Sequence, residues 1–237
     1  MKRKFSLVLL LLAVWLGGAQ PAYAATDNQN SNIMIVKKTR VAYNKGNKVN
    51  TWTTYEAGKK KAGRVKSGYK FTATGQAKYK GRIWYRIKNN KWILGTNTVT
   101  TKKYASIKAV AAKKAKQNKV VKLATAQVGR AYVWGATGPY SFDCSGLTMY
   151  VYKKATGLSL PHYSVSQHYY GKAVSTKRLV KGDLLFFGSK SAPHHVGIYV
   201  GGGKFVHASS PTVGVIKSKV STNRSSAFYP SSARRII

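Results

Sequence analysis

Acidic residues are scarce in this chain. Its 237 residues include 4 aspartates and glutamates against 42 lysines and arginines, a formal net charge of +38. A surface this basic repels itself and is expected to work beside a polyanion. The charge therefore predicts an anionic partner, and the alternative is a basic, solvated surface that has no specific partner.

Cysteine is almost absent as well, since Cys144 is the only one. An intramolecular disulfide is excluded, so the domains must be held together by packing. The chain is also not one of the small secreted scaffolds that depend on several disulfides.

Long apolar runs are missing after the start of the chain. Residues 1–4 are basic, residues 5–16 are apolar, and Ala22-Tyr23-Ala24 follows. This pattern is typical of a secretory signal peptide, residues 1–24, cleaved after Ala24. The apolar run is shorter than the about 20 residues of a spanning helix, so a membrane anchor is the weaker alternative. For an exported protein we expect wall phosphates or an anionic membrane face as the partner, and no specific nucleic acid.

The rest of the chain reads as two domains joined by a linker. Residues 25–32 are polar and predicted to be disordered. Residues 33–101 show short alternating strands, as in Arg82-Ile83-Trp84-Tyr85-Arg86-Ile87, with a tight turn predicted at Asn89-Asn90. The alanine- and lysine-rich stretch 102–118 is predicted to be a partly helical linker, and the second domain spans residues 119–237.

The lone cysteine lies at the start of a predicted helix. A glycine-rich loop ends at Asp143, a good N-cap residue, and Cys144, Leu147 and Val151 follow at helical spacing. Gly157 provides a stop signal. In a first helical turn the free backbone N–H groups favour a thiolate, so we expect the pKa of Cys144 to lie below its ordinary value. The alternative is a small buried cysteine that only packs the helix.

Two histidines are predicted to share one face of a β-hairpin. If Gly201-Gly202-Gly203 forms the whole loop, Val200 opposes Lys204. His195 and His207 then become diagonal neighbours on one face, because strand side chains alternate. A two-residue loop would place them on opposite faces, and a bulge would shift the count.

A cysteine and two imidazoles are the side chains that catalysis by a cysteine nucleophile needs. One imidazole takes the thiol proton, and a further polar group holds that imidazole in the productive orientation. His195 would be the base and His207 the orienting group, whereas His194 would face solvent. Zinc binding is the competing use of these residue types, but no fourth ligand is evident. Two core histidines without a role are the other alternative, and no metal or cofactor is predicted.

Residues 119–237 resemble the NlpC family of cell-wall cysteine peptidases. The resemblance implies an α+β fold of papain-like type, with helices packed on an antiparallel sheet. The segments that carry it are Tyr132-Val133-Trp134-Gly135, Phe142-Asp143-Cys144-Ser145-Gly146-Leu147, Gly182-Asp183-Leu184-Leu185-Phe186-Phe187, His195-Val196-Gly197-Ile198-Tyr199-Val200-Gly201 and Val206-His207-Ala208.

The resemblance also implies a reaction. Peptide stems of peptidoglycan would be hydrolysed, commonly at the bond between a γ-linked D-glutamyl residue and the following diamino acid. Cys144 would form the acyl-enzyme with His195 and His207 as its partners. The Tyr132 hydroxyl would join the Cys144 backbone N–H in stabilising the oxyanion.

Further positions match the substrate side of the family's site. Asp143 and Ser145 would line the stem-peptide site, with Asp143 either holding the free amine of the stem or only capping the helix. Ser164 matches another substrate-side position. His162 stands where the family usually has arginine, so a permanent cation for a stem carboxylate is missing.

The N-terminal module resembles the lysine-rich wall-binding repeat of bacterial surface-layer proteins, with a bacterial SH3-like domain as the alternative. The resemblance rests on Thr39-Arg40-Val41-Ala42-Tyr43-Asn44-Lys45-Gly46, on residues 81–87 and on residues 92–99. Either family implies docking to anionic wall polymers such as teichoic acids. The module has no cysteine or histidine and a single acid, Glu56, so we expect it to bind and not to catalyse.

The whole chain is thus expected to be a secreted, wall-associated peptidoglycan endopeptidase. One alternative is an amidase that cuts at the sugar–peptide junction with the same cysteine and histidines. The other is a non-catalytic wall-binding protein. No sequence feature points to an oligomeric state.

Overall fold

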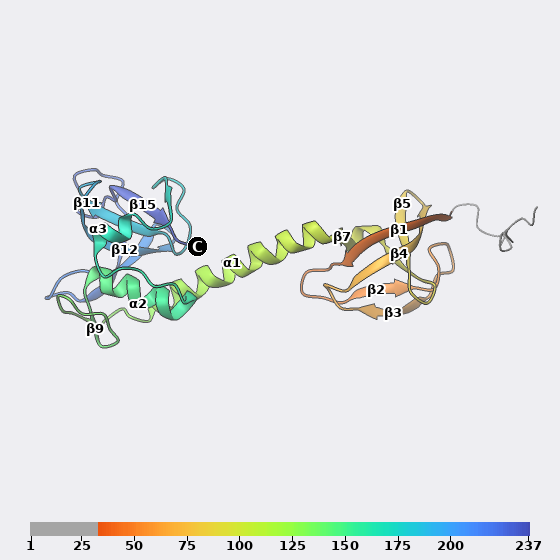
Figure 1. Cartoon of the computed structure of the whole chain (residues 1–237), viewed down its shortest axis with the longest axis horizontal. Coiled ribbons are helices and arrows are strands. Elements are labelled where there is room, and N and C mark those ends of the chain that lie inside the picture. Colours follow the sequence, from red (N-terminus) through yellow and green to blue (C-terminus); the bar gives the residue numbers. More distant parts are fainter. Residues whose placement is uncertain (1–32) are drawn as a thin grey trace, which may run out of the picture. The chain divides into compact units, whose positions relative to one another are not determined.

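The computed structural model describes residues 33–237. The predicted signal peptide and the predicted disordered segment, residues 1–32, lie outside the described residues. The chain divides into two compact units, one ending at Thr98 and the other starting at Val99, and their elements are labelled in Figure 1. Within the described part of the chain, no helix combines the length and the apolar character needed to cross a membrane.

The first unit is all-β, as predicted, and contains a seven-stranded sheet in the order β3-β2-β6-β5-β4-β1-β7. A short 3-10 helix, η1, precedes the last strand. The elements are β1 (Ile33–Ala42), β2 (Val49–Trp52), β3 (Lys61–Val65), β4 (Lys70–Tyr79), β5 (Arg82–Ile87), β6 (Lys91–Leu94), η1 (Gly95–Asn97) and β7 (Thr98–Thr100).

Alternating apolar residues and tight turns explain these strands. Along β4, Phe71, Ala73, Gly75 and Ala77 are buried, while the residues that alternate with them are exposed or half-buried. The turn predicted between β5 and β6 is confirmed, with Asn89 and Asn90 at φ values of 61° and 53°. Asparagine tolerates this left-handed region, which tight hairpin turns require.

The second unit packs helices against a six-stranded sheet in the order β10-β15-β11-β12-β13-β14. The predicted α+β class is therefore confirmed for this unit. Its elements are α1 (Thr101–Thr125), β8 (Ala131–Tyr132), β9 (Ser141–Phe142), α2 (Cys144–Thr156), α3 (Ser164–His168), β10 (Lys172–Val174), β11 (Leu184–Gly188), β12 (Pro193–Gly201), β13 (Lys204–Ala208), β14 (Val215–Lys219) and β15 (Ser232–Arg235).

Both faces of this sheet are covered at its centre. Leu184 and Phe186 of β11 join the core that also holds α2, whereas Leu185 and Phe187 pack with Phe205 on the other face. All four β11 residues are buried, which explains why the segment is apolar without alternation. The sheet is thus a rigid support for the strand β12 and its histidines.

Helix α1 runs through the stretch predicted to be a linker. It extends without a break from Thr101 to Thr125, past the expected domain start at Lys119. Its first N–H groups are capped by Thr100, whose hydroxyl accepts a hydrogen bond from the N–H of Lys103 at 3.2 Å. Of its 25 residues, Val120 and Ala124 are the buried ones. The lysine-rich part therefore has helix-forming residues but no apolar face, and only the last turns are anchored in the core.

Candidate active site

Cys144 is the first residue of α2, and the predicted caps of this helix are confirmed. The N-cap is Asp143, whose Oδ1 accepts a hydrogen bond from the N–H of Gly146 at 2.6 Å. At the other end Gly157 takes the left-handed conformation, with φ of 81°. Gly146 is needed because a Cβ there would collide with the carbonyl oxygen of Ala136. The loop before α2 thus lies tightly against its first turn.

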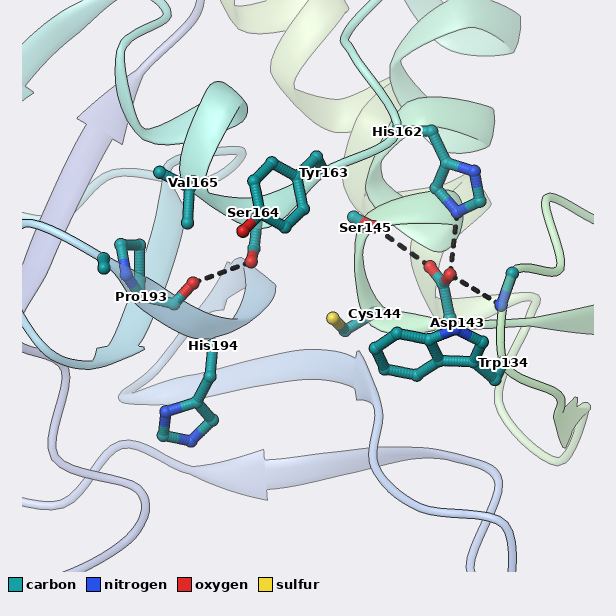
Figure 2. A pocket seen from close by; sticks show the side chains of 12 residues that line it. Trp134, Asp143, Cys144, Ser145, His162, Tyr163, Ser164, Val165, Pro193 and His194 are labelled. Carbon is teal, nitrogen blue, oxygen red and sulfur yellow. Dashed lines mark hydrogen bonds and ion pairs between the residues drawn. The ribbon is translucent and has the colours of Figure 1, made fainter.

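The carboxylate of Asp143 is fully engaged by groups of the protein. Oδ1 also accepts from the hydroxyl of Ser145 at 3.1 Å, and Oδ2 accepts from the N–H of Gly135 at 3.0 Å. His162 Nε2 lies 2.7 Å from the same Oδ2. Figure 2 shows these partners converging on Asp143. A carboxylate offers about four acceptor positions, so none remains for a substrate amine while His162 keeps this contact.

The two predicted histidines are brought together. His195 Nε2 lies 2.8 Å from His207 Nδ1. Ile198 pairs with Val206, the register that the three-glycine loop predicted, but the loop itself was predicted wrongly. Gly201, not Val200, pairs with Lys204, and a bulge in β12 absorbs the extra residue. A two-residue turn plus one bulge gives the same register as a three-residue loop.

Ser218 extends the histidine pair and was not among the site residues predicted from the sequence. Its Oγ lies 3.0 Å from His207 Nε2, and β14 places it opposite Phe205 of β13. Nothing near Ser218 in the chain identifies it, because only the strand pairing brings it to the ring. Gly197 is required beneath the pair, since a Cβ there would meet Phe205 and His207.

The expected low pKa of Cys144 is not found. Cys144 as a whole residue is 9% exposed, and burial raises the pKa of its thiol because a thiolate loses its hydration. Hydrogen bonds from the N–H groups of Val196 and Ser145 lower the pKa, and the charge of Asp143 raises it. The sequence identified the helix terminus but not the depth at which the sulfur lies.

The contact with Val196 places the sulfur beside β12, the strand that also carries His195. Within residues 33–237 no hydrogen bond joins the Cys144 sulfur directly to an imidazole ring. The pKa of His195 is lowered to about 3, first by burial and then by the charges of His207 and His194. Burial lowers the pKa of His207 to about 4. The resting site therefore pairs a neutral thiol with neutral imidazoles.

These depressed pKa values predict a loss of stability in acid. An unfolded histidine has a pKa of about 6.5, whereas the folded values are about 3 and 4. The contribution of each ring to the free energy of unfolding is complete above pH 6.5 and is lost as the pH falls towards the folded pKa. Between pH 7 and pH 5 we expect the free energy of unfolding to fall by roughly 2 kcal/mol per ring.

Urea unfolding at the two pH values, followed by near-ultraviolet circular dichroism, measures this loss. His207→Asn is the matched variant, because it keeps a polar group and removes one titrating ring. The loss should be clearly smaller in the variant than in the wild type, and an equal loss in both would contradict the assignment.

Cys144 lies in an open pocket of about 510 Å³, shown in Figure 2. Trp134 on its rim is 86% exposed and was not predicted as a site residue. His194, predicted to be a solvated bystander, is exposed but lines the pocket, whereas His195 and His207 are not among its lining residues. The pocket is lined by Trp134, Gly135, Asp143, Cys144, Ser145, His162, Tyr163, Ser164, Val165, Ala192, Pro193 and His194.

Of the remaining predicted residues, Ser164 lines this pocket and Tyr132 does not. Tyr132 is close enough to Cys144 and Asp143 for their charges to raise its pKa, after the larger effect of burial. Ser164 donates its hydroxyl to the carbonyl oxygen of Pro193 at 2.7 Å and so ties α3 to the start of β12. Gln167, also missed, is fully buried and donates to the carbonyl oxygen of Ser145 at 3.0 Å. Within residues 33–237 no three acidic, histidine or cysteine side chains converge as metal ligands.

Comparisons with known proteins cover the second unit. Residues 129–234 match the NlpC/P60 family model. Protein P54 of Enterococcus faecium is 44% identical over 84 residues, 35% of this chain and 16% of that protein. Probable endopeptidase p60 of Listeria monocytogenes is 45% identical over 89 residues, 38% of this chain and 18% of that protein. The chain thus spans less than a fifth of these curated relatives.

Among solved structures, the NlpC/p60 domain of the peptidoglycan hydrolase SagA is 37% identical, with a TM-score of 0.46. That likeness covers 50% of this chain and 97% of the SagA domain. The residues that match the family model include Cys144, His195 and His207. Residues 129–234 of this chain are therefore a domain of the NlpC/P60 family.

Proposed function

We propose that this chain is a secreted, wall-associated cysteine endopeptidase that cleaves peptide stems of peptidoglycan. The observation that carries the proposal is the lone cysteine at the N-terminus of α2, hydrogen-bonded to β12, the strand whose His195 is paired with His207. The p60 relative is named a probable endopeptidase, which supports the reaction class. The bond expected to be cleaved joins γ-D-glutamate to a diamino acid.

The hydrogen bonds of the histidine pair suggest how the base is prepared. We assign the tautomers so that His207 Nε2–H donates to Ser218 Oγ and His195 Nε2–H donates to His207 Nδ1, across the contacts of 3.0 and 2.8 Å. In this tautomer His195 Nδ1 is unprotonated and can take the thiol proton. Catalytic hydrogen bonds often tighten only when substrate is bound. We therefore place the transfer from Cys144 to His195 at the moment of attack.

Hydrolysis then follows in two halves. The Cys144 sulfur bonds to the carbonyl carbon, and the N–H of Cys144 and the Tyr132 hydroxyl stabilise the oxyanion. His195 passes its proton to the departing amine as the C–N bond breaks, which leaves a thioester. Water then gives a proton to His195 and attacks the thioester, and the sulfur leaves with that proton.

Of the two roles considered for Asp143, helix capping is the one that its contacts support. All its acceptor positions are used by Gly146, Ser145, Gly135 and His162. His162 thus contacts Asp143 and is not available to bind a carboxylate of the stem peptide. For this reason we favour stems whose amino end is already acylated by the glycan, since they bring no free amine to this carboxylate.

The all-β unit would hold the enzyme on its substrate. Most of its lysines and arginines are exposed, on strands and in turns, and Glu56 is its single acid. Lys59 lies over the Trp84 ring, with Nζ 5.8 Å from the ring centre, and Arg40 lies over Tyr85. Such a surface suits anionic wall polymers such as teichoic acids, to which attachment would weaken as salt rises.

A digest of purified cell wall tests the proposed bond. The products are labelled at new amino groups and identified by mass spectrometry. We expect new amino groups on the diamino acid and new carboxyl groups on γ-D-glutamate. Free muramyl sugar together with an intact stem would instead establish the amidase alternative.

A further inference from the structure

A second cavity in the NlpC/P60 domain shares no residue with the Cys144 pocket. It has a volume of about 450 Å³ and lies where β10 pairs with β15, beside the end of α3. Lys190, from the segment between β11 and β12, also reaches it. Its lining consists of His168, Ala173, Val174, Ser175, Thr176, Lys190, Ser231, Ser232, Ala233 and Arg234.

Three polar atoms, on three of the residues that line this cavity, are buried without a hydrogen-bond partner. They are His168 Nδ1, Ser232 Oγ and Arg234 Nε. A buried polar atom without a partner costs about 1 to 3 kcal/mol and is rare in native proteins. Three such atoms in one cavity point to a group that is bound there.

His168 is built into the wall and is not a surface side chain. It is 7% exposed. Its ring packs edge-on against Phe186, with ring centres 5.2 Å apart, and against Tyr169 at 5.4 Å. These rings hold the imidazole in place while its Nδ1 remains unpaired.

The charges around the cavity are all of one sign. None of its lining residues is acidic. Arg234 and Lys190 both lie near enough to His168 to lower its pKa, after the larger effect of burial. A water molecule could satisfy the polar atoms but would leave the half-buried Arg234 without a counter-charge.

The neighbouring arginine of β15, Arg235, has its positive charge balanced by a carboxylate. Arg235 donates to both oxygens of Asp183, from Nε and from Nη2, each at 2.9 Å. Adjacent strand residues point to opposite faces. Arg234 therefore points away from Asp183 and lines the cavity, which has no carboxylate among its lining residues.

We propose that this cavity binds an oxyanion, a phosphate or a carboxylate. The anion accepts hydrogen bonds from Arg234, Ser232 and the Nδ1–H tautomer of His168, and Lys190 adds its charge. The cavity is larger than a single oxyanion, so it also accommodates part of the polymer or peptide that carries the group. Helix α3 connects the two sites, because Ser164 and Val165 line the Cys144 pocket and His168 lines this one.

The test uses the full mature chain and follows the His168 ring by NMR. Because the whole protein attracts anions, a local signal is needed, and the ionic strength is held at about 0.15 M. Inorganic phosphate and acetate are the two probes, one for each source of the anion. We expect at least one of them to shift the His168 signals saturably.

Three variants decide whether the cavity is responsible. Arg234→Gln and Lys190→Gln should each weaken binding at least about tenfold, because each removes a charged partner of the anion. Lys190 is exposed, so its variant keeps the test valid if Arg234→Gln folds poorly. Arg224→Gln removes one exposed charge outside the cavity and should leave the affinity unchanged.

Each outcome is decisive. A shift with phosphate alone assigns the site to phosphate groups, and a shift with acetate alone assigns it to carboxylates. The proposal is overturned if neither probe moves the His168 signals, or if Arg224→Gln weakens binding as much as Lys190→Gln does. The result does not depend on peptidase activity, so it stands or falls separately from the proposed function.

Discussion

Cys144→Ala should lower wall hydrolysis by about 10⁴- to 10⁶-fold, the range seen when a catalytic nucleophile is removed. Alanine has no atom that can form the thioester. The variant should still fold, because the side chain is small and loses only its sulfur from the core that α2 shares with Val196. Release of new amino groups from purified wall measures the effect.

Wall binding is the control for this variant. The all-β unit contains none of the proposed catalytic residues, so co-sedimentation of the protein with wall should be unchanged. Equal hydrolysis by the variant and the wild type would rule out the nucleophile. If the wild type itself releases no new termini while it binds wall, the non-catalytic alternative is correct.

His195→Gln should reduce hydrolysis by about 10⁴-fold or more, because loss of the base disables the nucleophile as a unit. Glutamine keeps a polar side chain beside His207 but cannot shuttle a proton. The neighbouring His194 provides the matched control. It sits one residue earlier in β12, is exposed and lines the Cys144 pocket, whereas His195 is hydrogen-bonded to His207.

The two variants are compared by kcat/KM on the same soluble stem peptide. His194→Gln should keep at least about a tenth of the wild-type value, since it removes at most one substrate contact. The reverse result, with His194→Gln inactive and His195→Gln active, would show that the histidine lining the pocket is the base. The His195–His207 pair would then have a structural role.

Local signals in the sequence were sufficient for α2 and its caps. Asp143 and Gly157 act on backbone groups a few residues away, so their effect does not depend on the rest of the fold. The turn at Asn89 and Asn90 was predictable for the same reason. The hairpin register was predictable too, although the bulge at its end was not, because a bulge depends on how both strands twist and pack.

The direction of the Cys144 pKa could not be predicted from the sequence. The helix terminus lowers it and burial raises it, and burial is a property of the whole packed unit. His162 shows the same dependence. The sequence marked it as unusual, but its contact is with Asp143, which lies 19 residues earlier in the chain and is brought to it only by the fold.

By itself, the sequence determined the all-β and α+β units, the helix that starts at Cys144, and the family of the second unit, because these rest on periodicity and short-range motifs. Only the tertiary structure decided that the thiol rests neutral, that Ser218 completes the histidine pair, and that Arg234 lacks an acid while Arg235 has one. Those properties arise from desolvation and from strand pairing between distant segments, which no local pattern encodes.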